Sequence, residues 1–224
     1  AVVGTGDATQ RLVEGQDVTV SCAEGEVGKV YQGKLDFDIE TYDAGAYQRP
    51  RTKIMLIVGN PGRAMEFSQL PNDGVGLARM EFIISDSIGI HPHALLDFDQ
   101  LEPGLQQAIA PHIAGYASPR EFYVARLAEG IATITAAFYP KPVILRMSDF
   151  KSNEYSKLLG GEQFEPVEEN PMLGLRGAAR YHAESFAECF KLECEAVLRV
   201  RNEMGLDNLQ IMLHFVRRVE ALQR

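Results

Sequence analysis

The sequence predicts an α/β fold that contains the front part of a (β/α)8 barrel of the TIM type. Apolar runs of strand length recur along residues 53–224, helical stretches separate them, and Gly59 closes the first of them. Unbroken apolar runs are typical of parallel strands covered on both faces. A doubly wound sheet has the same local pattern, but no G-x-G-x-x-G turn favours a dinucleotide-binding fold. Residues 53–224 are also fewer than the roughly 250 of a complete barrel.

Five apolar runs are predicted to be strands. They are residues 54–58, 75–82, 143–147, 173–176 and 209–215. The fourth run is the least regular, because Gly174 and Gly177 interrupt it. A short helix is predicted at about residues 63–70, and a long one at about 181–204, which Gly205 ends.

The best-marked helix begins after Ser118. Ser118 is a suitable N-cap, Pro119 occupies the first helical position, and Glu121 completes a capping box. Apolar side chains then follow at helical spacing: Tyr123, Leu127, Ile131, Ile134 and Phe138. Pro140 and Pro142 end this helix, and the third strand follows directly.

The first 52 residues have a different pattern. Residues 1–35 contain short extended segments at 1–3, 18–21 and 29–31 separated by Gly-rich turns, which indicates a β-rich tail. Residues 36–52 show no period and are predicted to be a linker. The chain also lacks an initiator methionine and opens on a strand-like stretch, so we expect it to be an internal fragment of a longer protein.

Composition excludes several classes of function. Hydrophobic residues make up 46% and charged residues 24% of the 224, as in ordinary globular proteins. A net charge of −9 argues against broad contact with nucleic acid or an anionic membrane, and no apolar run approaches the roughly 20 residues that cross a bilayer. We expect neither a nucleic-acid nor a membrane partner, and three scattered cysteines fit a reducing cytoplasm.

Two arginines stand where a ligand would bind. Arg79 lies in the second apolar strand and Arg146 near the end of the third. An arginine in a buried strand is costly unless an anion pairs with it, and barrel enzymes bind ligands at the carboxyl ends of their strands. Two guanidiniums there would hold a carboxylate or phosphate. The alternative is a structural ion pair of each arginine with an acid such as Glu81 or Asp149.

Six stretches together resemble the phosphoenolpyruvate synthases (pyruvate, water dikinases) of the phosphoenolpyruvate-utilising enzyme family. They are residues 1–9, 74–83, 118–123, 129–133, 148–155 and 168–174, so the resemblance covers nearly the whole chain. Pyruvate phosphate dikinase and the first enzyme of the sugar phosphotransferase system are similar at the two arginine strands and at Asn170-Pro171. The run at residues 149–155 is typical of the synthases alone.

The resemblance implies a reaction and a division of labour. The parent enzyme would convert ATP, pyruvate and water to AMP, phosphoenolpyruvate and phosphate in gluconeogenesis, with Arg79 and Arg146 holding pyruvate or phosphoenolpyruvate. Residues 1–35 would be the end of a swivelling domain whose phosphohistidine precedes this chain. The Mg²⁺ ligands and the proton-donating cysteine would follow residue 224, so this chain would hold no catalytic or metal-binding residue and would be inactive alone. The family also implies a homodimer.

Other residues are weaker candidates. Arg176 is a third possible substrate contact, although a salt bridge explains it equally well, and His214 replaces a proline expected from the family pattern. Cys189 and Cys194 are predicted to be small core residues on a helix. The pair His91 and His93 lacks a third metal ligand and is expected to be solvated. The same expectation applies to four acids, Glu162, Glu165, Glu168 and Glu169. A non-catalytic anion-binding module remains an alternative function.

Overall fold

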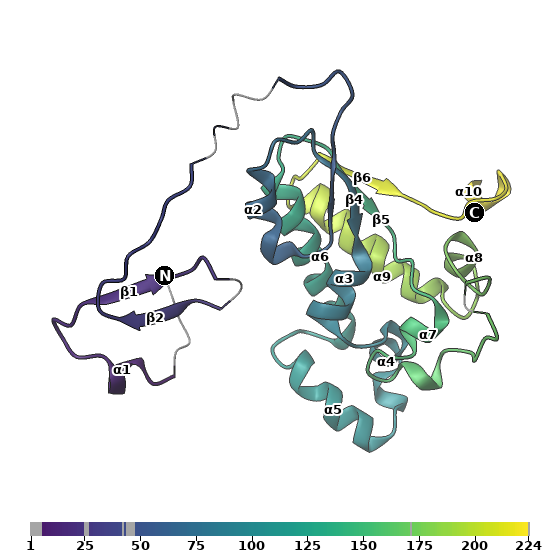
Figure 1. Ribbon diagram of the computed structural model, residues 1–224. Coiled ribbons are helices and arrows are strands. Elements are labelled where there is room, and N and C mark those ends of the chain that lie inside the picture. Colours follow the sequence, from purple (N-terminus) through teal and green to yellow (C-terminus); the bar gives the residue numbers. More distant parts are fainter. Residues whose placement is uncertain (1–5, 25–26, 42, 44–47, 171, 224) are drawn as a thin grey trace. The chain divides into compact units, whose positions relative to one another are not determined.

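The computed structural model describes residues 6–24, 27–41, 43, 48–170 and 172–223. The chain divides into two compact units, Ala1–Tyr47 and Gln48–Arg224, which are described separately (Figure 1).

The first unit contains a hairpin. Strands β1 (Val18–Ser21) and β2 (Lys29–Gln32) pair antiparallel, and a short helix, α1 (Ala8–Arg11), precedes them. The hydroxyl of Thr19 donates to the Gly33 carbonyl at 2.8 Å and accepts from the Leu35 amide at 2.9 Å, which ties the end of the hairpin to its start. Both strands were predicted, whereas α1 was not. The expected strand at residues 1–3 lies outside the described residues.

The second unit is built on a four-stranded parallel sheet in the order β3-β4-β5-β6, which is also the chain order. The strands are β3 (Leu56–Val58), β4 (Val75–Arg79), β5 (Val143–Arg146) and β6 (Leu209–Met212). The predicted α/β class with a parallel sheet is confirmed. The fourth predicted strand is wrong, because residues 173–176 form turns rather than a strand. The second strand is shorter than predicted, since the chain turns into a helix at Met80.

Helix α6 (Pro119–Ala137) packs against strand β5 and against two further helices, α2 (Ala64–Ser68) and α9 (Ala187–Leu198). The remaining α-helices are α3 (Met80–Ile83), α4 (Pro92–Leu96), α5 (Pro103–Ile113), α7 (Ser152–Tyr155), α8 (Ala178–Tyr181) and α10 (Glu220–Gln223). Short 3-10 helices lie at Pro61–Arg63, Phe98–Gln100 and Gly161–Gln163, and short π-helices at Ile84–Ile88 and Arg199–Glu203.

The predicted cap of α6 is confirmed. The side chain of Ser118 accepts a hydrogen bond from the Glu121 amide at 3.0 Å, with Pro119 in the first turn. The prediction of one continuous helix over residues 181–204 is wrong. A turn interrupts it after Tyr181 at the end of α8, and α9 begins only at Ala187. Phe186, which is 1% exposed, lies in this turn, so its burial does not require a continuous helix.

The two faces of the sheet differ in burial. Side chains that alternate along the strands toward the helices are fully buried: Val58, Ala78, Val143, Leu145 and Leu209. On the other face, Ile57 is 63% exposed, and Arg79 and Arg146 are half-buried. The apolar strands were expected to be covered on both faces, but the described residues cover one.

Among the described residues, no helix has the length and apolar composition needed to cross a membrane.

Candidate anion-binding site

The two predicted arginines are neighbours at the carboxyl edge of the sheet. Arg79 ends β4, Arg146 ends β5, and their Cα positions are paired in the parallel register. Residues paired in this way project from the same face, here the one that the helices leave open. A pocket of about 630 Å³ opens beside them. Its lining comprises Arg79, Glu81, Phe82, Ser85, Arg146, Asp149, Phe150, Lys151, Glu154, Lys157, Leu158 and Arg176.

Arg79 has no acidic partner among the described residues. Its guanidinium carbon lies 5.1 Å from the centroid of the Phe82 ring, a cation–π contact that orients the side chain but leaves its N–H donors unused. The structural ion pair considered as an alternative is therefore not formed by Arg79 within the described part of the chain. Its donors are available to a ligand.

Arg146, in contrast, is held by two carboxylates. Its Nη2 lies 3.3 Å from Glu81 Oε2 and its Nη1 lies 3.0 Å from Asp149 Oδ2. The ion-pair alternative thus describes Arg146, although its side chain also lines the pocket. Burial raises the pKa of Glu81, and the charge of Arg146 only partly opposes this effect.

Asp149 connects several basic groups. Arg176 donates to both of its oxygens, from Nε at 2.7 Å and from Nη2 at 3.0 Å, and His214 Nε2 lies 2.6 Å from Oδ1. Burial alone would raise the pKa of Asp149, but the Arg176 hydrogen bonds and the charges of His214 and Arg146 outweigh it and lower the pKa. Arg176 therefore does form the salt bridge anticipated for it, and it reaches the pocket as well.

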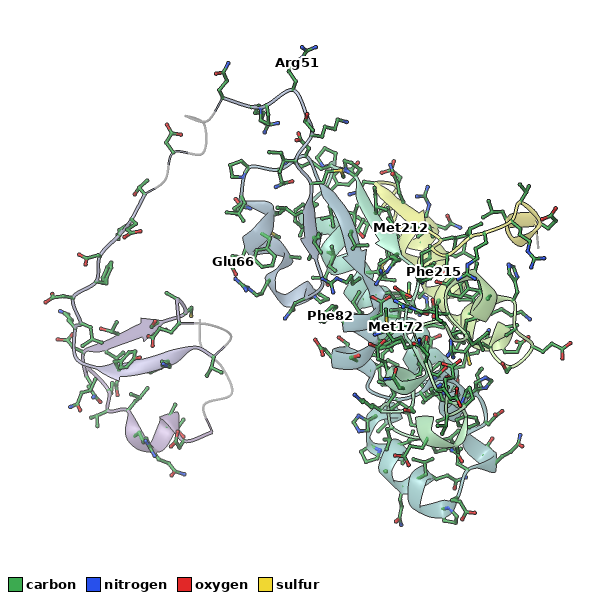
Figure 2. All side chains as sticks on the ribbon, turned by 45° about the vertical axis from the view of Figure 1, so that its right-hand side comes forward. Arg51, Glu66, Phe82, Met172, Met212 and Phe215 are labelled. Carbon is green, nitrogen blue, oxygen red and sulfur yellow. The ribbon has the colours of Figure 1, made fainter. Side chains whose placement is uncertain are left out.

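Large apolar side chains from separate segments lie near this edge of the sheet. Phe82 follows β4 and Phe215 follows β6, and Met172 belongs to the loop before α8 (Figure 2). The Arg176 guanidinium carbon lies 5.0 Å from the centroid of the Phe215 ring. Each of Arg79 and Arg176 thus has an aromatic neighbour that limits its orientation.

A buried polar network supports the loop that carries Asp149. The preceding residue, Ser148, donates to Glu193 of α9 from its amide at 3.2 Å and from its hydroxyl at 2.5 Å. The Tyr155 hydroxyl donates to the Ser148 hydroxyl at 3.0 Å, and the Tyr181 hydroxyl donates to the Ser148 carbonyl at 2.8 Å. Glu193 is fully buried, and this burial raises its pKa to about 7. Glu193 was not among the predicted site residues, because its only signal in the sequence is a glutamate on the apolar side of a helix.

A second buried cluster corrects two expectations. Arg180 is 2% exposed and binds Glu165 through two hydrogen bonds of 2.7 and 2.9 Å. His91 is fully buried, with Nε2 3.1 Å from Glu165 Oε1. Glu165 and His91 are therefore not solvated. The burial of Glu165 and His91 could not be predicted from the sequence. It depends on the fold of the loop that brings Glu165 to Arg180.

The residues of this site do not suit a magnesium ion. Both oxygens of Asp149 accept from Arg176, and Glu81 faces Arg146, so neither carboxylate is free for a cation. No group of three or more His, Cys, Asp or Glu side chains in the described residues has the arrangement of a metal site.

Cys189 is buried in α9, where burial raises the pKa of its thiol, in keeping with the predicted core position. Cys194 is half-buried on the same helix.

Comparison with known proteins identifies the family. The family model for the PEP-binding domain of PEP-utilising enzymes matches residues 36–224. The chain belongs to this family. It is 60% identical over 220 residues to phosphoenolpyruvate synthase of Escherichia coli (strain K12), an alignment that covers 98% of this chain and 28% of that protein. Phosphoenolpyruvate synthases of Pseudomonas aeruginosa and Deinococcus radiodurans are 58% and 57% identical, over 97% and 100% of this chain and 27% and 29% of theirs. The chain thus spans less than a third of the length of these relatives.

Proposed function

We propose that this chain is the pyruvate- and phosphoenolpyruvate-binding part of a phosphoenolpyruvate synthase. The parent enzyme would convert ATP, pyruvate and water to AMP, phosphoenolpyruvate and phosphate. The names of the relatives support this reaction, and the matched family supports a PEP-binding role. The names of the relatives also favour a phosphoenolpyruvate synthase over three alternatives: pyruvate phosphate dikinase, the first enzyme of the sugar phosphotransferase system and a non-catalytic anion-binding module.

The single observation that carries the proposal is the pair Arg79 and Arg146 at one pocket. Arg79 offers unused N–H donors, whereas Arg146 is fixed in direction by Glu81 and Asp149. A ligand with a carboxylate and a phosphoryl group would be bound by Arg79 and by the pocket side of Arg146. When a phosphoryl group moves onto the enolate oxygen of pyruvate, charge develops on oxygens that these guanidiniums stabilise.

The same proposal extends to the fold. Strand order that follows chain order, without a reversal, supports a (β/α)8 barrel over a doubly wound sheet. Further strands of the parent protein would cover the open face of the four-stranded sheet and pair with its outer strands, β3 and β6. Residues 1–35 would end a swivelling phosphohistidine domain, residues 36–52 would be its linker, and 53–224 would begin the barrel.

The remaining properties are proposed on the family alone. ATP would bind elsewhere in the parent enzyme, and the Mg²⁺ ligands and the proton-donating cysteine would follow residue 224. A homodimer in the cytoplasm, working in gluconeogenesis, fits the metabolic role that the relatives' names indicate.

The proposal is tested by calorimetric titration of phosphoenolpyruvate into the full-length protein. Arg79→Gln and Arg146→Gln are compared with Arg126→Gln, which removes the same charge from the exposed Arg126–Glu129 pair on α6. We expect Arg79→Gln to weaken binding at least about tenfold, since a hydrogen-bonded charge pair contributes roughly 1.5–3 kcal/mol. The control should bind as the wild type does.

Thermal unfolding separates binding from stability. Arg79→Gln should leave the melting temperature nearly unchanged, because Arg79 has no acidic partner among the described residues, whereas Arg146→Gln should lower it by freeing Glu81 and Asp149. If phosphoenolpyruvate binds both variants as tightly as the wild type, the two arginines are structural and the proposed function is wrong.

A further inference from the structure

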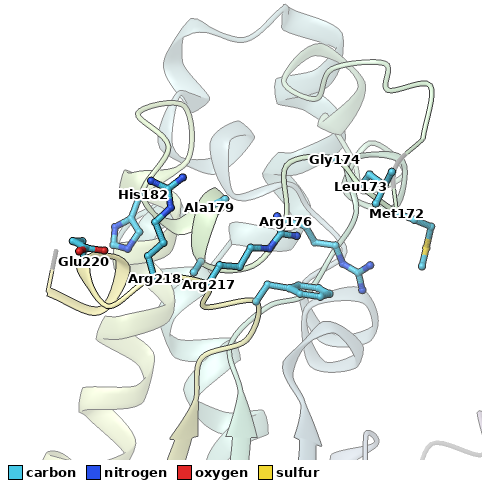
Figure 3. A pocket seen from close by; sticks show the side chains of 11 residues that line it. Met172, Leu173, Gly174, Arg176, Ala179, His182, Arg217, Arg218 and Glu220 are labelled. Carbon is cyan, nitrogen blue, oxygen red and sulfur yellow. The ribbon is translucent and has the colours of Figure 1, made fainter.

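A second pocket adjoins the proposed substrate pocket. It has a volume of about 330 Å³ and lies where β6 leads into the C-terminal residues (Figure 3). Its lining comprises Met172, Leu173, Gly174, Arg176, Ala178, Ala179, His182, Phe215, Arg217, Arg218 and Glu220. Arg176 lines both pockets, so the two sites share one guanidinium.

The charge of this pocket differs from that of the chain. Three arginines, Arg176, Arg217 and Arg218, and one acid, Glu220, line it. The chain as a whole carries a net charge of −9. The pocket therefore concentrates positive charge on an acidic protein, and a bound anion would offset the repulsion between its guanidiniums.

The partners of the three arginines narrow the choice of ligand. Arg176 uses Nε and Nη2 on Asp149, and its Nη1 donates to none of the described residues. Neither Arg217 nor Arg218 forms an ion pair with a described residue, and both are exposed. Figure 3 shows Arg218 beside His182 and Glu220, with Met172 and Leu173 at the opposite side of the pocket. The free donors therefore belong to planar guanidiniums, which suit a tetrahedral oxyanion.

We infer that Arg176, Arg217 and Arg218 form a second anion subsite, which binds a phosphate group, free or as a small monoester. The pocket volume of about 330 Å³ is sufficient for a phosphate group with bound water. The subsite lies beside the proposed substrate pocket, and its existence does not depend on that pocket's ligand. Arg176, which Asp149 holds in place, links the two.

The test is calorimetric titration of the full-length protein with inorganic phosphate and, separately, with methyl phosphate. The double variant Arg217→Gln, Arg218→Gln is compared with the wild type. A matched control, Arg120→Gln with Arg126→Gln, removes two charges from α6. We expect roughly a tenfold or greater loss of phosphate affinity in the first double variant and none in the control. The probe that binds more tightly identifies the source as free phosphate or an ester.

The Arg79→Gln variant separates this inference from the proposed function. Phosphate binding that survives in Arg79→Gln but is lost in the Arg217, Arg218 double variant supports the second subsite. Phosphate binding that is lost only in Arg79→Gln, or that is unchanged in the double variant, overturns it. Phosphoenolpyruvate affinity, measured on the same proteins, decides the proposed function independently. Arg217 and Arg218 are exposed and form no ion pair with a described residue, and the melting temperature of the double variant is compared with that of the matched control to exclude a loss of folding.

Discussion

Replacing Glu193 with glutamine should remove a pH-dependent loss of stability. Glu193 is fully buried, and among the described residues its hydrogen-bond donors come from Ser148. Burial raises its pKa from 4.5 to about 7. A carboxyl group whose pKa is higher in the folded state than in the unfolded state favours folding when protonated, so its contribution is present at low pH and is lost as the pH rises through 7. Glutamine has a similar shape and stays neutral.

The size of the effect follows from the pKa difference. Each pKa unit corresponds to about 1.36 kcal/mol, so ionising Glu193 in the folded protein costs roughly 3 kcal/mol above pH 7. Most of this cost appears between pH 5 and pH 8, where we expect wild type to lose about 2–3 kcal/mol relative to Glu193→Gln. A loss of that size changes an opening equilibrium roughly 30- to 160-fold.

Hydrogen exchange measured by mass spectrometry is the appropriate assay, because it reports local opening even in a multidomain protein. Protection of peptides from β5 and α9 is compared between wild type and Glu193→Gln at each pH, so that the intrinsic pH dependence of exchange cancels. Glu184→Gln, on an exposed turn, is the control. A wild-type-to-variant ratio that stays constant from pH 5 to pH 8 would refute the reasoning, since Glu193 would then keep one protonation state throughout.

Three further substitutions should change stability, each measured by thermal unfolding. Ser118→Ala should cost about 1 kcal/mol, because the α6 cap loses its acceptor for a backbone amide. Arg180→Ala should cost about 3–5 kcal/mol by leaving Glu165 buried without its cation; a loss below about 1 kcal/mol would contradict this. Gly130→Ala should destabilise by about 1 kcal/mol despite the better helix propensity of alanine, because the new Cβ would lie 2.4 Å from Ile83 Cγ2; a stabilised variant would show that Ile83 moves aside readily.

Much of the fold was predictable because its signals are local. The cap at Ser118, the proline that follows it and the helical spacing of apolar residues lie within a few turns of one another, and α6 forms where they predict it. Residues 173–176 were mispredicted for a physical reason. Their apolar character suggested a strand, but Gly174 approaches the Glu168 carboxylate so closely that a Cβ there would lie 2.2 Å from its oxygens, and the segment turns instead.

The site was predictable only in part. Arg79 and Arg146 were recognisable because arginine is unusual in an apolar strand, and the parallel register makes them neighbours. Ion pairs with Glu81 or Asp149 were predicted as the alternative to ligand binding, and Arg146 forms both. No local pattern indicated that Arg79 would lack an acidic partner among the described residues. Arg217 and Arg218 follow the last strand, and no pattern in the sequence marks them as ligand-binding residues.

Sequence by itself determined the class of the fold, the parallel strands, the capped helix and the two arginines at strand ends, because periodicity, capping and turn residues act over short distances. Tertiary structure alone decided which charges are buried and paired. Glu165 meets Arg180 and His91, and Glu193 meets Ser148, across 15 to 74 residues of chain. The pKa and the role of a charged group depend on its neighbours in space, and no local pattern encodes contacts over such separations.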